Sequence, residues 1–177
     1  MPNWCSNRAR ITGPAPVIKK ITEILNQDDT PLLNWMVPQP NFEGDQDWYM
    51  WNVNNWGTKW DIGDVYIDNN AEEDSIEFSF CTAWAPPVEA FTTWAFADGR
   101  VQFTLEYWEP GCGFVGVTTF DGEYLDTDDV DSNSDPARYT EIASDTWGYE
   151  EYEEPEPLTE WYKDGVEARG LDEHGTK

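Results

Sequence analysis

The alternation of apolar and polar residues along roughly the first 110 residues predicts four strands and two helices. In an extended segment at residues 4–12, Cys5, Ala9 and Ile11 lie on one side and two arginines on the other, which is typical of a half-buried strand. Apolar residues recur at helical spacing after each of two proline-containing breaks. In chain order, the predicted elements are a strand at 4–12, a helix at 16–27, strands at 64–70 and 75–84, a helix between Ala85-Pro86-Pro87 and Asp98-Gly99, and a strand at 100–108.

This order of elements is typical of the ferredoxin-like split βαβ fold, an antiparallel sheet with two helices on one face. Two further strand-like runs, 113–120 and 123–126, flank Asp121-Gly122, a dipeptide that favours a two-residue β-hairpin. Residues 31–61 carry five tryptophans without a regular period and are too long for a simple connection, so we expect a structured excursion packed by its own rings. We therefore predict an α+β domain over residues 1–125 that contains the Trp-rich insertion at 31–61 and ends with the added β-hairpin.

The net charge changes the range of partners that we expect. The chain has 36 acidic against 10 basic residues, a formal net charge of −26. Such a field repels nucleic acids and anionic membranes and attracts basic surfaces or cations. A coat of solvated carboxylates that serves only solubility is the simpler interpretation of the same charge, and both interpretations stay open at this point.

The sequence shows no membrane-spanning or signal-peptide pattern. Its longest apolar stretches are shorter than the roughly 18 residues of a membrane span, and its first residues lack a basic segment followed by an apolar one. The three cysteines, Cys5, Cys81 and Cys112, contain no CxxC pair, which favours reduced thiols. We therefore expect a cytoplasmic protein.

The last third of the sequence differs in composition from the rest. Acidic residues dominate from residue 126 onward, and aromatic residues are interleaved with them as far as residue 163. Disordered acidic tails normally lack aromatic residues. We therefore expect the acidic C-terminal extension at residues 126–163 to dock on the domain, with rings inward and carboxylates outward, and residues 164–177 to form a loose tail.

Three motifs carry a resemblance to a known family. They are "MPNWCSN…ITG" at the start, "NNWGTKWD" at 54–61 and "FCTAWAPPVEAF" at 80–91. Together they resemble the YubB-type ferredoxin-like domain family, which is scattered through phages, plasmids and other mobile elements. The resemblance covers roughly residues 1–110 and implies a ferredoxin-like fold, a mobile-element origin and the cytoplasm of a host cell. It brings no catalytic residues with it, and it is silent about the acidic C-terminal third.

The segment "NVNNWGTKWD" (52–61) places Lys59 between two tryptophans. A catalytic lysine needs partners that shift its pKa, and no nucleophile or base accompanies Lys59 in the sequence. The simpler interpretation is a structural corner in which the indole rings pack on the sheet. The alternative is a small-ligand or peptide pocket, lined by Trp51, Trp56, Lys59, Trp60 and Trp84.

Residues 129–141 give an incomplete match to a calcium-binding loop. Asp129, Asp131, Asn133 and Asp135 stand at alternate positions, as calcium ligands would. The sixth position of the loop is a serine rather than the required glycine, and the acidic residue expected at its end comes one place late. We therefore predict no metal site, and cation binding at residues 129–141 is the alternative.

Patterns of enzymatic chemistry are weak in this sequence. The single histidine, His174, is close to the C-terminus and has no catalytic partners, and "GCGFVG" (111–116) lacks the lysine and helix of a phosphate-binding loop. We therefore predict no catalytic residues and no cofactor. RNA binding through rings on a sheet is a further alternative. Against it, these rings are the natural filling beneath the helices, and the basic residues are dispersed. The rings concerned are Phe78, Phe80, Phe103 and Tyr107.

The acidic surface itself is the remaining candidate. Carboxylates held at fixed positions can stand in for the phosphates of DNA in the groove of a basic protein, since pre-organisation lowers the cost of association. Duplex DNA carries one charge per ~1.7 Å of axis, whereas alternate residues of a strand lie about 6.5 Å apart, so two adjacent acidic elements are needed. We therefore predict a non-enzymatic, phage-type inhibitor that binds a basic, nucleic-acid-binding host protein, a defence or DNA-handling factor, by mimicking DNA charge.

The predicted contacts of this inhibitor all belong to the acidic extension. They are Asp126, Asp128, Asp129, Asp131, Glu150, Glu151, Glu153 and Glu154, with Tyr149 and Tyr152 as aromatic anchors. In the alternative, the chain is a peptide or small-ligand binding module that uses the Trp-rich loop, and its acidic surface serves only solubility. Neither hypothesis involves direct contact with nucleic acid or a membrane.

Overall fold

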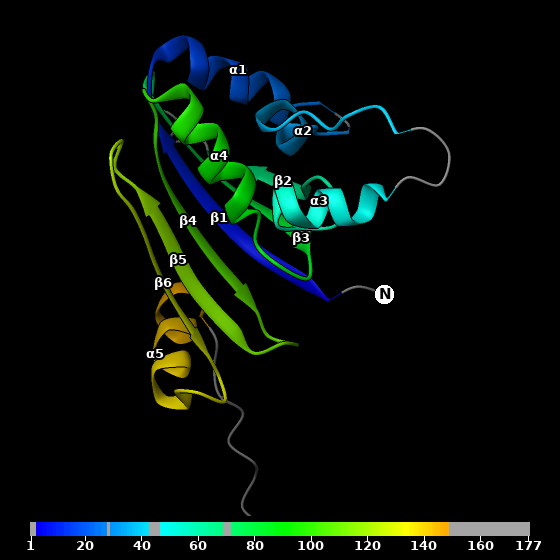
Figure 1. Cartoon of the computed structure of the whole chain (residues 1–177). Coiled ribbons are helices and arrows are strands. Elements are labelled where there is room, and N and C mark those ends of the chain that lie inside the picture. Colours follow the sequence, from blue (N-terminus) through cyan, green and yellow to red (C-terminus); the bar gives the residue numbers. More distant parts are fainter. Residues whose placement is uncertain (1–2, 28, 43–46, 69–71, 149–177) are drawn as a thin grey trace, which may run out of the picture.

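The computed structural model describes residues 3–27, 29–42, 47–68 and 72–148. Within these ranges, six strands form one antiparallel sheet in the order β2-β3-β1-β4-β5-β6, and five helices accompany it (Figure 1). The strands are β1 (Trp4–Thr12), β2 (Gly63–Ile67), β3 (Ser75–Ala83), β4 (Gln102–Glu109), β5 (Phe114–Phe120) and β6 (Leu125–Asp131). The helices are α1 (Ala15–Leu25), α2 (Leu32–Met36), α3 (Trp48–Trp56), α4 (Val88–Asp98) and α5 (Pro136–Trp147). The predicted α+β class with an antiparallel sheet is confirmed.

β1 is the central connection of the sheet, because it pairs with β3 on one side and with β4 on the other. Ala9 of β1 lies opposite Phe78 and Leu105, and all three side chains are buried. Its neighbour Arg8 lies opposite Glu106 and pairs with that carboxylate at 3.3 Å. Because successive side chains of a strand point to opposite faces, the sheet has one apolar face and one more polar face.

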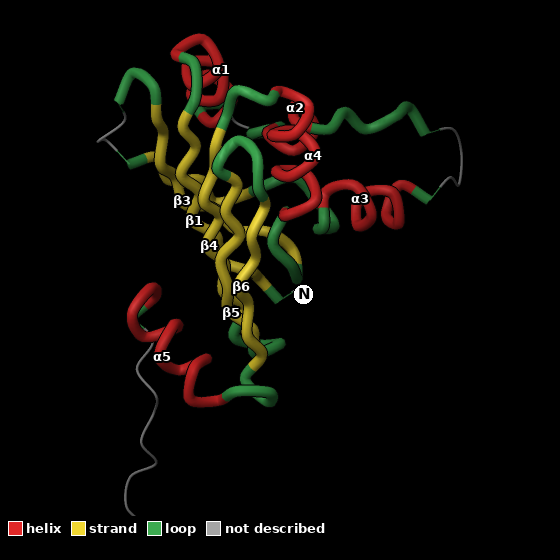
Figure 2. Tube along the Cα trace, turned by 60° about the vertical axis from the view of Figure 1, so that its left-hand side comes forward, coloured by secondary structure: helices red, strands yellow, loops and turns green. Residues whose placement is uncertain are grey.

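Helices α1 to α4 cover the apolar face of the sheet, and α5 lies on the other side (Figure 2). Phe91 of α4 is fully buried, with its ring centroid 6.3 Å from that of Phe80 and 5.5 Å from that of Phe103. α1 adds Ile18 and Ile21, which its helical spacing places on one face. None of the helices in the described ranges is long and apolar enough to cross a membrane.

The Trp-rich insertion contains two short helices, α2 and α3, which its irregular sequence pattern did not indicate. One carboxylate, that of Asp61, ties the insertion together by accepting hydrogen bonds from the backbone N of Leu33 (2.8 Å) and of Asn34 (2.9 Å). Burial raises the pKa of Asp61, although these backbone donors act in the opposite direction. The insertion is therefore a folded part of the domain, anchored at the start of α2.

The largest departure from the predicted elements lies after the hairpin turn. The second hairpin strand was expected at residues 123–126, but β6 extends to Asp131 because its backbone pairs with β5 from Phe120↔Leu125 to Phe114↔Asp131. The segment after β6 forms α5, a helix that the sequence pattern did not indicate. The end of the strand predicted at 64–70 lies outside the described residues, as do residues 149–163 of the expected docked segment and the expected tail at 164–177.

We expect the replacement Phe91→Ala to lower the free energy of unfolding by about 3–5 kcal/mol, because a fully buried ring is lost and a cavity remains. Phe96→Ala is the matched control on the same helix, since Phe96 is 54% exposed and its loss should be much smaller. Urea denaturation followed by tryptophan fluorescence measures both values. Equal losses in the two variants would contradict the packing of α4.

Candidate functional site

β6, the turn that follows it and α5 form what we call the acidic strand–helix unit (residues 125–147). Two of its carboxylates shape the backbone. Asp131 accepts a hydrogen bond from the backbone N of Asn133 (2.8 Å), which fixes the turn. Asp135 accepts one from the backbone N of Arg138 (3.1 Å) and so caps the start of α5. These two aspartates fix where β6 ends and where α5 begins, because each supplies an acceptor at a change in backbone direction.

These local roles also account for the incomplete calcium-loop match at residues 129–141. The side chains of Asp131 and Asp135 are directed at backbone N–H groups of the turn and of the helix start. Hydrogen bonding from the backbone of Asn133 lowers the pKa of Asp131. Across the described ranges, no three His, Cys, Asp or Glu side chains gather in a way that could hold a metal ion.

α5 is fixed to the sheet by a second, smaller apolar cluster. Val115 of β5, Val130 of β6 and Tyr139 of α5 form its buried part. The indole Nε1 of Trp108 donates a hydrogen bond to the hydroxyl of Tyr139 (2.9 Å), and the ring of Trp147 stacks on Trp108 at a centroid distance of 6.3 Å. The acidic strand–helix unit is therefore packed on the domain at least as far as the end of α5.

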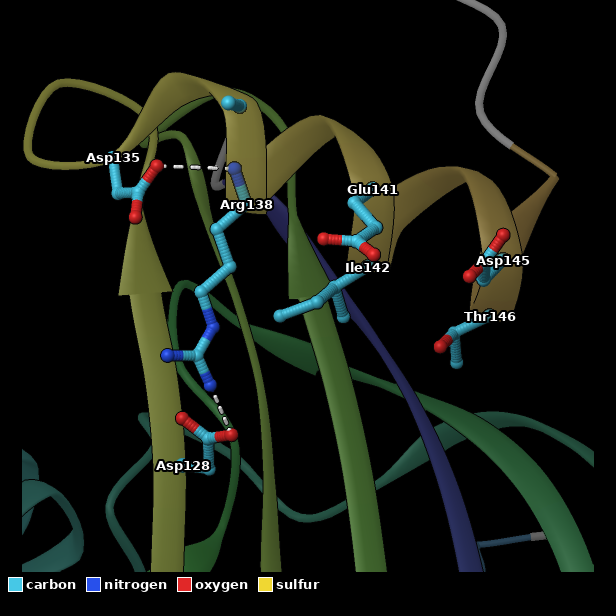
Figure 3. A pocket seen from close by; sticks show the side chains of 8 residues that line it. Asp128, Asp135, Arg138, Glu141, Ile142, Asp145 and Thr146 are labelled. Atoms are coloured by element: carbon cyan, nitrogen blue, oxygen red, sulfur yellow. Dashed lines mark hydrogen bonds and ion pairs between the residues drawn. The ribbon is translucent and has the colours of Figure 1, made fainter.

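Four carboxylates of this unit surround a shallow hollow between β6 and α5. They are Asp128, Asp135, Glu141 and Asp145, and Arg138 lies among them (Figure 3). The guanidinium of Arg138 forms an ion pair with Asp128. Glu141 and Asp145 are four residues apart on α5, so they lie on the same side of the helix. The hollow is therefore a predominantly negative surface whose charges are carried by a strand and a helix.

The structure divides the predicted contacts of β6 between two faces. Asp126 and Asp128 share the side of Val130, which faces α5, whereas Asp129 and Asp131 point to the opposite side. Sequence reasoning had not separated them, because the length of β6 was not predicted. The remaining predicted contacts lie outside the described residues: Tyr149, Glu150, Glu151, Tyr152, Glu153 and Glu154.

Three carboxylates at the hollow were missed as candidate contacts. They are Asp135, Glu141 and Asp145. The signals for them were present in the sequence: Asp135-Pro136 is a favourable start for a helix, and Gly148 is a favourable residue just after its end. Once a helix is assumed between these positions, the four-residue spacing of Glu141 and Asp145 places both on one side.

The structure places the five residues of the predicted ligand pocket in two groups. Trp56 is buried with its Nε1 donating to the backbone O of Val37 (2.9 Å), and Trp51 packs edge-on against it at 5.8 Å. Both belong to α3, which directs these two rings toward the core. The chain then turns outward, and Trp60 and Trp84 are 40% and 38% exposed. Trp51 and Trp56 therefore form a core pair, whereas Lys59, Trp60 and Trp84 form a separate surface group, and ligand binding by these residues stays a prediction.

That surface group forms what we call the aromatic surface. It consists of Trp4, Trp48, Tyr49, Lys59, Trp60 and Trp84. The Lys59 Nζ lies 4.3 Å from the ring centroid of Trp60, 5.1 Å from that of Trp84 and 5.6 Å from that of Tyr49. Each distance is within the range of a cation–π contact. Lys59 is thus held in place by rings.

The residues that form the corner beside Lys59 are structural. Asn52 donates from its side chain to the backbone O of Lys59 (2.7 Å), and the hydroxyl of Thr58 donates to the backbone O of Ala83 (2.9 Å). Gly57 ends α3 with a φ of 84°, and an added Cβ would lie 2.0 Å from the carboxylate of Glu89. The corner is therefore fixed tightly to the sheet and to α4.

Comparison with protein families shows which family this chain is related to. The family described as "Ferredoxin-like domain in Api92-like protein" matches residues 55–156, more than half of the chain. The chain belongs to this family. The match runs through β6 and α5, so the acidic strand–helix unit lies within the matched family region.

A solved structure shows the same fold at low sequence identity. The crystal structure of a protein api92 from Yersinia pseudotuberculosis is similar with a TM-score of 0.53 and 11% identity, over 73% of this chain and 98% of that chain. No curated protein matches the chain. The ferredoxin-like part of the resemblance seen in the sequence is confirmed, whereas the YubB-type assignment and the mobile-element origin stay predictions.

None of the three thiols has the lowered pKa of a catalytic nucleophile. Burial, reinforced by the charge of Glu109, raises the pKa of Cys5 to about 12. A hydrogen bond with Glu109 raises the pKa of the exposed Cys112, and burial raises that of Cys81. The carboxylate of Glu109 is itself held by the backbone N–H groups of Gly111 and Cys112. The carboxylate of Glu109 therefore fixes the turn between β4 and β5 beside Cys112.

We expect iodoacetamide to modify Cys112 faster than Cys5 in the folded protein, because Cys112 is exposed and Cys5 is fully buried. A raised pKa leaves less thiolate at a given pH, so the Cys112 rate should be below that of an unperturbed thiol and should rise as the pH increases. Mass spectrometry of time points measures both sites. Labelling of Cys5 as fast as that of Cys112 before unfolding would contradict the described packing.

We expect Asp135→Ala to destabilise α5 by about 0.5–2 kcal/mol through loss of the N-cap. Asp145→Ala is the matched control, because Asp145 stands in the last helical turn, where removal of a negative charge is neutral or slightly favourable. Native-state hydrogen exchange of the α5 amides measures the local stability. A greater effect of Asp145→Ala than of Asp135→Ala would show that the cap is not formed.

Proposed function

We propose that this chain is a non-enzymatic, phage-type inhibitor that binds a basic, nucleic-acid-binding protein of its host. In this proposal the acidic strand–helix unit occupies the surface on which the partner holds DNA, with carboxylates in the positions of phosphates. The partner is a defence or DNA-handling factor, and binding takes place in the host cytoplasm. The mobile-element origin that the sequence resemblance implies belongs to the same proposal.

The observation that carries the proposal is the arrangement of carboxylates around the hollow between β6 and α5. Asp128, Asp135, Glu141 and Asp145 line it, and Asp126 shares the α5 side of β6. These acids stand on paired backbone and on a capped helix rather than on a long connection. The acidic surface therefore loses little conformational freedom when a partner binds, and this favours affinity.

The spacing of these groups supports a phosphate-like surface. Asp126 and Asp128 are two residues apart on a strand, which corresponds to about 6.6 Å. Glu141 and Asp145 are one turn apart on a helix, which corresponds to about 6 Å. Neither row alone reaches the charge density of duplex DNA, one charge per ~1.7 Å of axis. Two adjacent rows approach it more closely, and the packing of α5 against β6 makes the rows adjacent.

Arg138, the one basic residue among the described residues that line the hollow, positions an acidic side chain. Arg138 pairs with Asp128 across the hollow. The other three carboxylates that line the hollow outnumber this one cation, so the surface stays negative. The pair is exposed on both sides, so its direct contribution to stability is small. Its contribution to the proposal is to hold the side chain of Asp128 beside the helix.

The overall charge supports rapid and selective encounter. A net charge of −26 attracts basic proteins over distances limited by the Debye length, about 8 Å at physiological ionic strength. It also repels nucleic acid, so the chain would compete with DNA for the partner rather than join a ternary complex. Binding should therefore weaken as salt rises and as duplex DNA is added.

To test this, the full-length chain is immobilised, exposed to host lysate at low salt and eluted with duplex DNA. We expect DNA-binding proteins to elute, and mass spectrometry identifies them. The variant Asp126→Asn/Asp128→Asn/Glu141→Gln/Asp145→Asn should bind the identified partner at least about tenfold more weakly, because several charge contacts are lost. The matched control is Asp29→Asn/Glu72→Gln/Glu73→Gln/Asp74→Asn, which removes equal charge from exposed positions elsewhere.

Equal weakening by both fourfold variants would show that only total charge matters, and this would overturn the assignment to the acidic strand–helix unit. Retention of the same proteins in the presence of excess duplex DNA, or at high salt, would overturn the DNA-mimicry proposal itself. Circular dichroism and thermal unfolding of the variants confirm that each one is folded before binding is measured.

A further inference from the structure

The aromatic surface consists of two sets of rings in mutual contact, and the Lys59 ammonium lies against rings of both sets. Trp4 is 49% exposed, Trp48 and Trp60 are each 40% exposed, and Trp84 is 38% exposed. Ring contacts connect Trp4 with Trp60, and Trp48 with Trp84 through Tyr49. Scattered single apolar residues are normal on a protein surface, but a connected group of this kind marks an interaction site.

These rings come from separate parts of the chain that the fold brings together. Trp4 opens β1, Trp48 and Tyr49 open α3, Trp60 follows α3, and Trp84 follows β3. Trp4 lies opposite Ala83 in the sheet, next to Trp84. The surface is therefore built on the rigid sheet and on the corner that Asn52 and Thr58 fix, and it does not depend on a single loop.

Trp84 has a backbone conformation that bulky residues rarely adopt. Its φ is +73°, in the left-handed region, and no glycine stands at this position. Such a conformation costs on the order of 1–3 kcal/mol and persists where surrounding contacts enforce it, often at functional sites. Here it places the ring of Trp84 against Tyr49 (6.2 Å) and beside the Lys59 ammonium (5.1 Å).

Lys59 supplies a charge at the centre of this surface. Its Nζ faces three rings, and within the described ranges no carboxylate forms an ion pair with it. An ammonium held by rings is partly shielded from water and retains donors for an anionic group. A ligand of complementary charge therefore carries an anionic group, which in an unmodified peptide is a carboxylate.

The spacing of the rings indicates the form of the ligand. Neighbouring centroids are 6.5 Å apart for Trp4 and Trp60, and 6.2 Å apart for both Trp48–Tyr49 and Tyr49–Trp84. Alternate side chains of an extended peptide lie about 6.6 Å apart on one face. Successive side chains on one face of such a peptide can therefore meet successive rings.

We propose that the aromatic surface binds an extended, largely apolar peptide segment of another protein, with one carboxylate of that segment paired to Lys59. A polyacidic segment or a nucleic acid does not fit, because a net charge of −26 repels both. This surface shares no residue with the acidic strand–helix unit, so the proposal goes beyond inhibition by charge mimicry and does not depend on it.

The test is a selection from a displayed library of random peptides on the full-length protein. We expect the enriched peptides to share one acidic residue between apolar or aromatic residues. Binding of a synthetic enriched peptide should fall about tenfold or more with Lys59→Met, because a charge-assisted hydrogen bond is lost. Lys59→Arg should retain most of the affinity. Lys19→Met on α1, which removes an exposed lysine elsewhere, is the matched control and should change nothing.

Two further measurements locate the contact. Replacement of the acidic residue of the peptide by its amide should weaken binding to the wild-type protein and have no further effect on Lys59→Met. In NMR spectra, the indole N–H resonances of Trp4, Trp60 and Trp84 should shift when the peptide is added, whereas that of the buried Trp56 should not.

Several outcomes would overturn the proposal. Selection that yields no peptide dependent on Lys59, or yields basic peptides, would exclude an acidic partner. Tighter binding of tetramethylammonium by Lys59→Met than by the wild-type protein, without peptide binding, would show that the rings form a site for cations. Because the binding assay uses synthetic peptides and a separate surface, its failure leaves the DNA-competition experiment unaffected.

Discussion

The two-residue period of the β-sheet decides which side chains of this protein can meet. In β1, it sends Ala9 into the core and its neighbour Arg8 to the opposite face. In β5 and β6, it places Val115 and Val130 under α5 and so aligns Asp126 and Asp128 with the acids of that helix. A shift of β6 by one residue would exchange the two faces of the strand. The packing of α5 and the composition of the acidic hollow would then both be lost.

The elements with a clear apolar period could be read from the sequence, and those without one could not. β3 and β4 alternate regularly, and α1 and α4 follow proline breaks, so their approximate positions were predictable. β6 reads "LDTDDVD", which has only one inward-facing apolar residue, Val130; the strand exists because the neighbouring β5 offers a complete row of backbone partners. α5 has few apolar residues, and its boundaries depend on Asp135 and Gly148 rather than on periodicity. Strand pairing therefore determines β6, and capping determines α5, although the local sequence pattern indicates neither element.

The candidate sites show the same limit. The aspartates of β6 were recognisable as an acidic group, but their division between two faces required the strand register. The tryptophans near Lys59 were recognisable as a group as well, yet Trp56 serves the core and Trp60 the surface, although only four positions separate them. The helical turn of α3 and its left-handed end at Gly57 cause this difference. Trp4 and Tyr49 could not be assigned to the surface from sequence, since only the fold brings β1, α3 and the segment after β3 together.

The position of β6 at one end of the sheet has a consequence for how copies of the protein behave toward one another. A terminal strand leaves a row of backbone donors and acceptors that can recruit a further strand and start aggregation. Here that row is flanked by the exposed carboxylates of Asp126, Asp128 and Asp129, so a second β6 would have to approach through like charge. At the other end, β2 carries an irregular register between Gly63 and Tyr66, which interrupts the straight edge that an added strand requires. The exposed carboxylates of β6 therefore oppose the addition of a further strand at this edge of the sheet.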